Sequence, residues 1–380
     1  MTITDLIIIG SGPGGYRAAA YAAKNGIQVI VFEDIDTGGT CLNRGCIPTK
    51  CLAHDAYTDH PDFLQVMQRK SDVTLQLRQG VESLLTQPGI QLIHAKATLR
   101  DYHTVVAGGE EYQSKHIILA TGSTSKLPPI EGLVYQKYGE SNVMTSDELL
   151  NIDHVPSRLC IIGAGVIGME FASIFASFGS KVTVVEFMKE CLPTIDSDIA
   201  KRLRKCMEKR GTEFYLQAAV RKIESGKVIF EKKGKENIVE ADEILIATGR
   251  AANIEGLNLD EVGVAHDKRG ILVNDNMETS VKGIYAIGDV NAMQMLAHAA
   301  VFQGRRAINN ILGISDQIRF DIMPAAVFTY PEAGCVGKTE DTCKEENLKY
   351  SIVKGYYRSN GRALSLNETE GMVKLIVDTN

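Results

Sequence analysis

The same pattern of glycines, apolar runs and an acid occurs twice in this chain at the same spacing. The first copy runs through residues 6–33: an apolar run, Gly-Ser-Gly-Pro-Gly-Gly from Gly10, an alanine-rich stretch, and a second apolar run that ends at Glu33. The second copy runs through residues 159–186, with Gly-Ala-Gly-Val-Ile-Gly from Gly163 and a closing Glu186. A strand, a Gly-x-Gly-x-x-Gly turn, a helix, a second strand and an acid make a dinucleotide-binding βαβ unit. The chain is therefore predicted to be an α/β protein with two Rossmann-like units.

Each glycine of the motif has its own task. The first makes the tight turn, the second lets a pyrophosphate approach the backbone, and the third lets the helix pack on the strand. The terminal acid can accept a hydrogen bond from a ribose hydroxyl. Each unit is later followed by an apolar strand that ends in Ala-Thr-Gly, at Gly122 and at Gly249. The residues expected at the nucleotides are Gly10, Gly12, Pro13, Gly14, Gly15 and Glu33 in the first unit, and Gly163, Gly165, Val166, Ile167, Gly168, Glu186 and Gly249 in the second.

Glu186 also predicts which nicotinamide cofactor binds. A carboxylate at this position accepts from a free 2′-hydroxyl and repels a 2′-phosphate. No arginine follows within the next few positions to reverse that preference. The second site is therefore expected to bind NAD and not NADP.

Just after the first unit, Cys41 and Cys46 lie five positions apart. In a regular α-helix that spacing separates the Cα atoms by about 8–9 Å, whereas a disulfide needs about 4.4–6.8 Å. If the two are bonded, the backbone between them cannot be regular helix, and Gly45 permits such a distortion. Pro48 fits the first turn of a helix, so Cys46 would lie near a helix N-terminus, where the dipole stabilises a thiolate.

Three other interpretations of these cysteines stay open at this point. They could be two unlinked buried thiols, the usual state of cysteine in a reducing compartment. They could form a metal site with Cys51 and His54, although the short paired spacing of a zinc knuckle is missing. They could also be a structural staple. Two nucleotide sites beside a cysteine pair favour an electron path, in which one nucleotide exchanges hydride and a flavin relays electrons to a disulfide.

Composition narrows the class of protein further. The 380 residues are enough for two or three domains. A formal net charge of −6 argues against nucleic acid and anionic membrane partners, and no apolar run is long enough to cross a bilayer. The chain enters a strand-like run at once, so we expect no signal or transit peptide. Eight cysteines without a leader predict a cytoplasmic protein.

The stretch from Gly38 to Lys50, Gly-Gly-Thr-Cys-Leu-Asn-Arg-Gly-Cys-Ile-Pro-Thr-Lys, resembles the redox motif of the pyridine nucleotide–disulfide oxidoreductases. The resemblance extends over nearly the whole chain. It includes Thr279–Asp289, Met295–His298 and the segment from Phe328 to Glu340. The best match is the branch that oxidises dihydrolipoyl groups and reduces NAD.

The resemblance implies FAD at the first site and a redox-active Cys41–Cys46 disulfide. Cys46 would face the flavin, and Cys41 would exchange with substrate. Lys50 would lie near the flavin N5 and pair with Glu170, and Asp289 would hold the ribityl chain. The implied catalytic residues are Cys41, Cys46, Lys50 and Glu170. Further FAD contacts would be Thr40, Cys41, Lys50, Ala95, Thr121, Gly122, Ser123, Met295, Leu296, Ala297 and His298, and Glu170 and Val220 would join the NAD set; no metal is expected.

Alternatives within the family are less consistent with these residues. Glutathione reductases generally use NADP, whereas Glu186 is acidic. Mercuric reductase needs a further cysteine pair near its C-terminus, and none follows Cys343. Some transhydrogenases lack an intact cysteine pair, whereas both cysteines are present here. Ala252 departs from the proline that the family often has after Gly-Arg, which is a loop detail. A non-catalytic flavoprotein that serves as a docking subunit would share every cofactor motif and stays open.

The architecture implied is an FAD domain of residues 1–148 and 271–320, an NAD domain of residues 149–270, and an α+β interface domain of residues 321–380. The resemblance implies a homodimer that serves the lipoyl domain of a 2-oxo acid dehydrogenase or glycine cleavage complex. The family takes its catalytic base from a His-Pro-Thr segment near the C-terminus, and no histidine follows His298 here. We therefore expect the interface domain to be incomplete, the 380 residues to be part of a longer protein, and lipoamide turnover by these residues alone to be low, with His54 the first alternative base to test.

Overall fold

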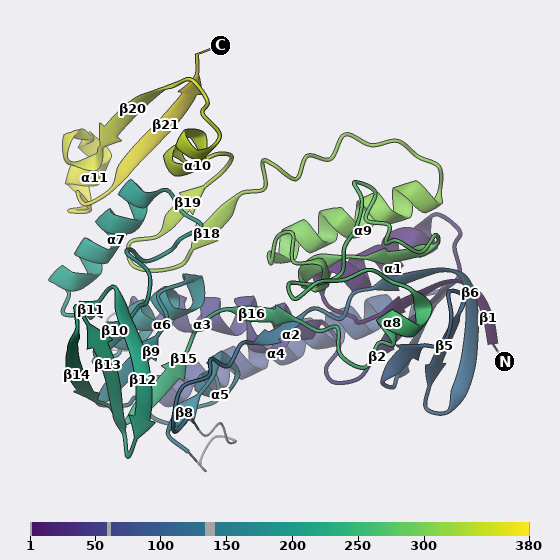
Figure 1. Ribbon diagram of the computed structural model, residues 1–380, viewed down its shortest axis with the longest axis horizontal. Coiled ribbons are helices and arrows are strands. Elements are labelled where there is room, and N and C mark those ends of the chain that lie inside the picture. The colour runs from purple at the N-terminus through teal and green to yellow at the C-terminus, as the bar shows by residue number, and fades with distance from the viewer. Residues whose placement is uncertain (1, 59–61, 134–140, 380) are drawn as a thin grey trace. The chain divides into compact units, whose positions relative to one another are not determined.

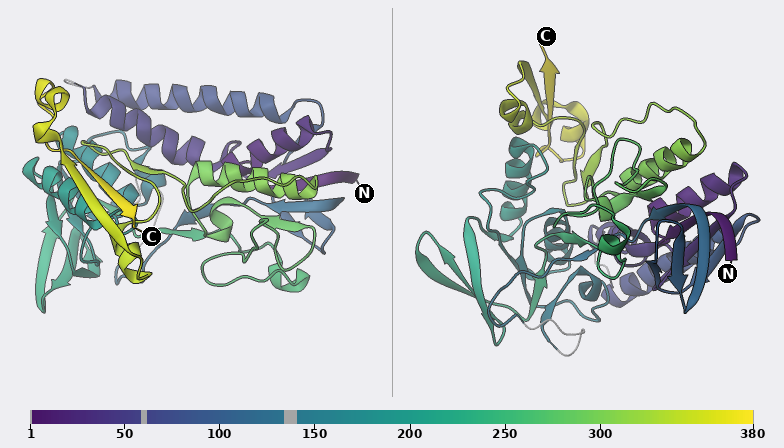
Figure 2. Two further views of the ribbon diagram at one scale, coloured as in Figure 1. Left: turned by 90° about the horizontal axis from the view of Figure 1, so that it is seen from above. Right: turned by 45° about the vertical axis from the view of Figure 1, so that its right-hand side comes forward.

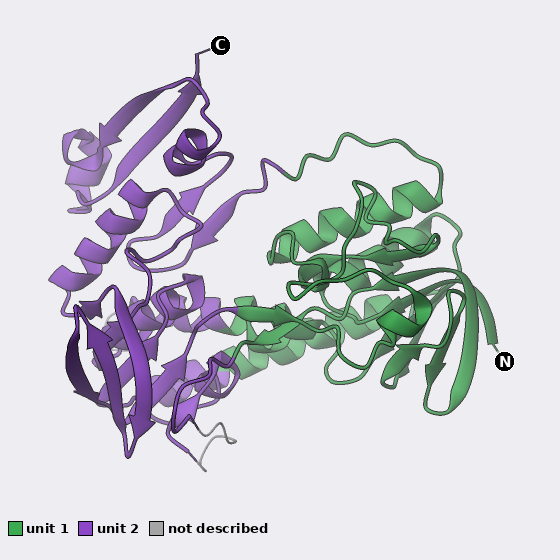
Figure 3. Cartoon of the chain, viewed as in Figure 1, with its two compact units in different colours: residues 1–48, 69–126, 250–320 green, residues 49–68, 127–249, 321–380 purple. Residues whose placement is uncertain are grey.

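The computed structural model describes residues 2–58, 62–133 and 141–379, so residues 1 and 380 of the predicted first and last domains lie outside it. The chain divides into two compact units (Figure 3). Unit 1 contains residues 1–48, 69–126 and 250–320, and unit 2 contains residues 49–68, 127–249 and 321–380. The domain boundaries derived from the sequence stay a prediction.

Unit 1 is built on a seven-stranded mixed sheet whose path is β3-β2-β1-β6-β5-β4, with β17 also paired to β6 (Figure 1). The strands β3, β2, β1, β6 and β17 are parallel, and β5 and β4 continue antiparallel. A short antiparallel ribbon joins β7 to β16. The strands of unit 1 are β1 (Thr2–Ile9), β2 (Val29–Glu33), β3 (Ile90–His94), β4 (Ala97–Leu99), β5 (Thr104–Ala107), β6 (Glu110–Leu119), β7 (Ser123–Ser125), β16 (Arg250–Ala252) and β17 (Ile284–Ala286).

The central strand of this sheet is buried on both faces. Leu6 and Ile8 of β1 pack with α1 (Pro13–Lys24) and α9 (Ala297–Ile311) in one apolar cluster. Ile7 and Ile9 point the other way into a second cluster. This is why the run reads as continuously apolar, as in parallel strands covered on both sides. The packing of α9 along α1 can be followed in Figures 1 and 2.

Five further helical segments lie wholly or partly in unit 1. Two helices follow each other across the cysteine motif, and a longer one comes next along the chain. The segments are α2 (Gly39–Arg44), α3 (Cys46–Ala56), α4 (Phe63–Leu85), α8 (Leu259–Val262) and the 3-10 turn η1 (Gly288–Asn291). No described helix is both long and apolar enough to cross a membrane.

Unit 2 repeats the parallel architecture with a five-stranded sheet in the order β11-β10-β9-β15-β8. Beside it lies a three-stranded antiparallel sheet, β12-β13-β14. The elements are β8 (Val143–Met144), α5 (Ser146–Leu149), β9 (Arg158–Ile162), α6 (Val166–Ser177), β10 (Lys181–Val185), α7 (Ser197–Lys209), β11 (Glu213–Tyr215), β12 (Ala218–Glu224), β13 (Lys227–Lys232), β14 (Lys235–Glu240) and β15 (Glu243–Ile246). The parallel strands that each sheet is built on confirm the predicted fold class.

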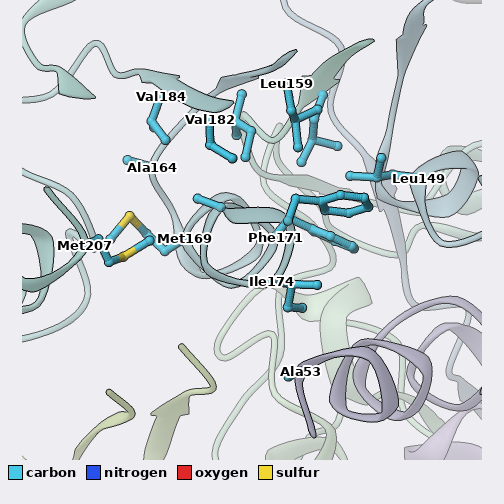
Figure 4. Close-up of a cluster of buried hydrophobic side chains, with 14 of the residues drawn as sticks. Ala53, Leu149, Leu159, Ala164, Met169, Phe171, Ile174, Val182, Val184 and Met207 are labelled. Carbon is cyan, nitrogen blue, oxygen red and sulfur yellow. The ribbon is translucent and has the colours of Figure 1, made fainter. Parts of the chain in front are cut away.

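A single apolar cluster holds the centre of unit 2 (Figure 4). Phe171 and Ile174 of α6 pack against Leu159 of β9 and Val182 of β10. Ala53 of α3 joins the same cluster, so part of the helix that begins at the cysteine motif belongs to this core. The opposite face of the sheet is covered by Phe230 and its neighbours from the antiparallel sheet.

The last sixty residues form two hairpins and short helices within unit 2. The second hairpin is shown in yellow in Figures 1 and 2. Its strands pair antiparallel from Tyr350 with Asp378 to Tyr356 with Met372. The elements are β18 (Ala325–Val327), β19 (Ala333–Cys335), α10 (Glu340–Glu345), β20 (Tyr350–Tyr356), the 3-10 turn η2 (Tyr357–Ser359), α11 (Gly361–Ser365) and β21 (Met372–Asp378). β18, β20 and β21 coincide with strand-like runs of the sequence at residues 325–328, 351–353 and 372–377.

Candidate active site

The first glycine turn connects β1 to α1 and is fixed by close backbone contacts. The amide of Gly10 donates to the carbonyl of Phe32 at 2.8 Å. A Cβ on Gly10 would lie 2.3 Å from the carbonyl oxygen of Ala120, and one on Gly15 would lie 2.0 Å from the carbonyl oxygen of Gly10. No side chain larger than hydrogen fits at either position.

The second turn, between β9 and α6, repeats this geometry in unit 2. The amide of Gly163 donates to the carbonyl of Val185 at 2.9 Å. A Cβ on Gly163 would lie 2.4 Å from the carbonyl oxygen of Ala247, and one on Gly168 would lie 2.1 Å from that of Gly163. The internal repeat seen in the sequence is therefore a repeat of structure.

The acid at the end of each second strand binds its own glycine turn. Oε2 of Glu33 accepts from the backbone amide of Ser11 at 2.9 Å and from its hydroxyl at 2.6 Å. Oε2 of Glu186 accepts from the amide of Ala164, and its Oε1 accepts from that of Met188 at 2.6 Å. A carboxylate has about four lone-pair positions, so each acid keeps capacity for a ribose hydroxyl.

The middle glycine of each turn leaves a space that a dinucleotide fits. A Cβ on Gly12 would come no closer than 4.0 Å to another residue, and one on Gly165 would meet nothing within that distance. These glycines precede α1 and α6, and no side chain in the described parts of the chain caps either helix. The first-turn amides of both helices are thus available to an anionic pyrophosphate.

Cys41 and Cys46 lie on two helices that break at Gly45. Cys41 is in α2, and Cys46 is the first residue of α3. A Cβ on Gly45 would lie 2.9 Å from the carbonyl oxygen of Thr40 and 3.3 Å from Cα of Cys41. Both cysteines are partly exposed. The expected interruption of the helix is present, and α3 starts two residues before Pro48.

A polar network, which sequence reasoning missed, holds the residues before Cys41. Nδ2 of Asn43 donates to the carbonyls of Thr37 and Gly39 at 3.0 Å each, and its Oδ1 accepts from Nε of Arg78 at 2.9 Å. Arg78 also pairs with the carboxylate of Asp36 at 3.1 Å. Arg78 is in α4, far from the motif in sequence, so no local pattern could have indicated it.

Asp289, expected near the ribityl chain, follows β17 in η1 and accepts from Ser123 Oγ at 2.5 Å. The same hydroxyl accepts from Nε of Arg250 at 2.7 Å, and NH2 of Arg250 donates to the Ser123 carbonyl at 2.6 Å. Thr121 donates to the carbonyl of Asn253 at 2.7 Å. Arg250 is a second residue that the sequence did not single out.

Apart from Lys50, the other predicted FAD residues also lie in unit 1. Ala95 follows β3, whose last residue pairs with Glu33 in the register of the sheet. Gly122 is the last residue of the link from β6 to β7 and has a φ of 73°. Met295 and Leu296 precede α9, and Ala297 and His298 are its first residues. Thr40, Pro13 and Gly14 lie in the first turns of α2 and α1.

Lys50 and Glu170 meet in unit 2, as expected from the resemblance. Their Nζ and Oε1 atoms are 3.6 Å apart. Oε1 also accepts from the amide of Phe328 at 2.9 Å. Burial raises the pKa of Glu170 above its usual range, against the opposing effects of Lys50 and the Phe328 amide.

The remaining predicted NAD residues lie in unit 2. Val166, Ile167 and Gly168 form the first turn of α6, and Gly249 follows β15 with a φ of 108°. Val220 is in β12, beside an irregularity in its pairing with β13. Within the described residues, no three side chains of His, Cys, Asp or Glu gather as a group able to hold a metal ion.

Comparison with known proteins agrees with this geometry. The model of the pyridine nucleotide-disulphide oxidoreductase family matches residues 4–304, and that of the family's dimerisation domain matches residues 323–380. The chain belongs to the pyridine nucleotide-disulphide oxidoreductases. FAD and NAD are therefore its cofactors, and the open glycine cradles described above fit both.

This pyridine nucleotide-disulphide oxidoreductase is similar to several known proteins. It is 36% identical to the mitochondrial dihydrolipoyl dehydrogenase of Pisum sativum, over 98% of this chain and 80% of the relative. It is 37% identical to the leghemoglobin reductase of Glycine max, over 98% and 76%. The Cu(II) complex of the HOCl-induced flavoprotein disulfide reductase RclA from Escherichia coli superposes with a TM-score of 0.90 at 33% identity, over 100% and 87%.

Proposed function

We propose that the chain oxidises dihydrolipoyl groups through a Cys41–Cys46 disulfide and FAD, with reduction of NAD. The observation that carries the proposal is the break at Gly45, which puts one cysteine in α2 and the other at the start of α3. A cysteine pair on a bent, glycine-flanked segment suits a disulfide bond that is alternately formed and reduced. The similarity to dihydrolipoyl dehydrogenases over most of both chains supports the choice of substrate.

The two cysteines have different roles in this proposal. A substrate thiolate attacks the Cys41 sulfur, and a second exchange releases the substrate as a disulfide and leaves both cysteines reduced. Cys46, as the first residue of α3, is stabilised as a thiolate by the helix dipole. When bound, FAD and NAD supply the conversion between thiol electrons and hydride.

Lys50 and Glu170 would support the same step. Lys50 follows Cys46 by one turn of α3, so the two side chains lie on one face of the helix. We assign Lys50 the task of holding a positive charge beside the flavin, with Glu170 as its fixed counter-ion. Glu33 and Glu186 would bind the ribose hydroxyls of FAD and NAD.

The partner and the compartment follow from the substrate. We propose that the protein acts as a homodimer, consistent with its dimerisation domain. Its partner would be the lipoyl domain of a 2-oxo acid dehydrogenase or glycine cleavage complex. The eight cysteines and a catalytic disulfide favour a reducing compartment, and we propose the cytoplasm.

The direct test is NADH formation from dihydrolipoamide by the purified protein. Cys41→Ser should abolish this turnover while FAD stays bound, because the outer thiol is needed only for exchange. Cys335→Ser, which changes a partly exposed cysteine in β19, is the matched control and should leave turnover intact. A protein that binds no flavin on reconstitution, or a Cys41→Ser variant with full turnover, would refute the proposal.

A second candidate is a reductase that runs in the opposite direction, from NADH to a small disulfide or to Cu(II). The similarity to RclA over the whole chain supports it. The two candidates differ in their preferred substrate pair. Comparing kcat/KM for dihydrolipoamide with NAD against kcat/KM for NADH with Cu(II) or a low-molecular-weight disulfide decides between them.

A further inference from the structure

Phe328 contacts both members of the Lys50–Glu170 pair. Its ring lies under the Lys50 ammonium, with Nζ 4.2 Å from the ring centroid. Its backbone amide donates to Oε1 of Glu170 at 2.9 Å. One residue that follows β18 therefore binds the cation with its side chain and the carboxylate with its backbone. All three residues belong to unit 2.

Glu170 alone does not fix where the Lys50 ammonium lies. The ion pair is long, at 3.6 Å, and about a third of the Lys50 side chain is exposed. Lysine carries its charge on a flexible stem with rotatable donors. A second contact in a different direction is needed to restrict it, and the face of an aromatic ring attracts an ammonium within about 6 Å. The Phe328 ring provides that contact.

Phe328 is itself held from the other side. Its carbonyl accepts from the Tyr57 hydroxyl at 3.2 Å, and that hydroxyl lies 2.9 Å from Ser173 Oγ. Ser173 also accepts from the amide of Tyr330 at 2.9 Å, and the Tyr57 and Tyr330 rings stack with centroids 5.2 Å apart. The loop after β18 is thus tied to α6, which carries Glu170, and to Tyr57, which directly follows α3, the helix that carries Lys50.

We propose that Phe328 is a positioning residue, whose ring holds the Lys50 ammonium against Glu170. The inference rests on the proposed function in assigning Lys50 a place beside the flavin. A cation held near a redox group favours its more negative, reduced form. Loss of the ring therefore makes reduction of the bound flavin less favourable.

The first arm of the test uses the apoprotein, so it does not depend on flavin. Carbon-13 NMR of labelled glutamate carboxyls, assigned with Glu170→Gln, gives the pKa of Glu170. In Phe328→Leu the Lys50 ammonium is held less firmly beside Glu170. Its charge then lowers the pKa of Glu170 less, while burial still raises it, so the pKa of Glu170 should rise by about half a pH unit. Phe328→Tyr keeps the ring face and should behave as wild type. Phe178→Leu removes an aromatic ring from the same unit, away from Lys50, and is the matched control.

Fluorinated phenylalanines at position 328 separate the electrostatic contact from packing. Stepwise fluorination keeps the ring shape but weakens the negative face of the ring. The Glu170 pKa should rise stepwise with fluorine content, which a purely structural role would not produce. A Glu170 titration that is unchanged in Phe328→Leu and in the fluorinated series would overturn the assignment.

The second arm uses the flavin-loaded protein. In Phe328→Leu the equilibrium for flavin reduction should weaken by about two- to fivefold, the scale of one half-exposed cation–π contact. An unchanged equilibrium would overturn the role of Phe328 in the reaction. A protein that binds no flavin would refute the proposed function instead, and the apoprotein arm would still test the contact.

Discussion

At the scale of single residues, Glu186 is predicted to set the nucleotide preference. Its two carboxylate oxygens accept from the amides of Ala164 and Met188, which orients the side chain at the glycine turn. Glu186→Ala should weaken NAD binding by about 1–2 kcal/mol, the scale of one charge-assisted hydrogen bond. It should also narrow the preference for NAD over NADP, because the repulsion of a 2′-phosphate is lost. Titration calorimetry with both nucleotides measures the two effects.

Glu213→Ala is a suitable control for that experiment. Glu213 lies in β11 of the same unit, and its partner is the exposed Lys181 at 3.6 Å. Its removal should leave both affinities unchanged. A wild-type protein that prefers NADPH would contradict the role given to Glu186.

Arg250 is predicted to act on FAD through another residue. Its guanidinium binds the Ser123 hydroxyl, which in turn donates to Asp289. Arg250→Met should let this hydroxyl reorient and lower the FAD affinity by about 1 kcal/mol, the net value of one hydrogen bond. Fluorescence titration of apoprotein with FAD checks this. Arg100→Met, which removes an exposed ion pair with Glu111, is the control, and equal FAD affinity in all three proteins would argue against the relay.

The residues that sequence reasoning found and those that it missed differ in a physical way. The sequence indicates Gly10, Gly15 and Glu33 because the turn, the helix packing and the acid that explain them all lie within one βαβ unit. Arg250 and Phe328 act on residues more than one hundred positions away. Only the folded chain brings such pairs together, and arginine or phenylalanine alone in a sequence indicates nothing specific.

At the scale of elements, the third glycine of each motif is predicted to control one nucleotide site independently of the other. A Cβ at Gly168 would lie 2.1 Å from the carbonyl oxygen of Gly163 and would push α6 away from β9. Gly168→Ala should cost about 1–3 kcal/mol of stability, as overpacking does, and abolish NAD binding while FAD stays bound. Gly15→Ala should do the reverse. Flavin absorbance and NAD titration report the two sites separately.

Gly80→Ala is the matched control for these substitutions. Gly80 lies inside α4, and a Cβ there would meet nothing within 4 Å. Since glycine is unfavourable in a helix interior, this change should stabilise the protein by about 0.5–1 kcal/mol. Loss of both nucleotides in Gly168→Ala would mean that the two units do not bind independently.

The strands and helices around the motifs could be predicted because the apolar runs are short, continuous and bounded by glycine. The break between α2 and α3 is expected on the condition that Cys41 and Cys46 are bonded, because a regular helix would hold their Cα atoms too far apart for a disulfide. The division of α3 between the two units could not be predicted: Cys46 belongs to unit 1, whereas Ala53 packs in the core of unit 2. The spacing of residues along the sequence predicts the helix α3, but it does not predict which hydrophobic core the second half of α3 packs into.

At the scale of the whole molecule, a buried lysine joins distant parts of unit 2. Nζ of Lys374 in β21 lies 2.9 Å from Asp196 and from Asp198 and 2.6 Å from Glu340. Its side chain is only 3% exposed. Burial works against its charge, but the three carboxylates raise the pKa of Lys374. Lys374→Met would leave these carboxylates facing one another.

Lys374→Met should therefore destabilise the protein by about 1.5–3 kcal/mol, the scale of a lost hydrogen bond between charged groups, because Asp198 keeps Lys354 and Glu340 keeps Lys344. Lys354→Met is the control, because Lys354 binds Asp198 at 2.7 Å from a more exposed position and should cost about 1 kcal/mol or less. Urea unfolding gives both values. If the two variants lose a similar free energy of unfolding, the low exposure of the Lys374 side chain does not make its contacts more stabilising than those of Lys354.

The same cluster predicts how stability depends on pH. Hydrogen bonds from Lys354 and Lys374 lower the pKa of Asp198 to about 2, and those from Lys344 and Lys374 lower the pKa of Glu340 to about 2. Unfolded carboxyls titrate near pH 4. Since the folded-state values are lower, the cluster stabilises the fold fully above about pH 4, and this stability is lost as the pH falls toward about 2. The difference in unfolding free energy between wild type and Lys374→Met should therefore narrow between about pH 5 and pH 2. A constant difference over that range would show that Lys374 is not what holds these carboxylates ionised.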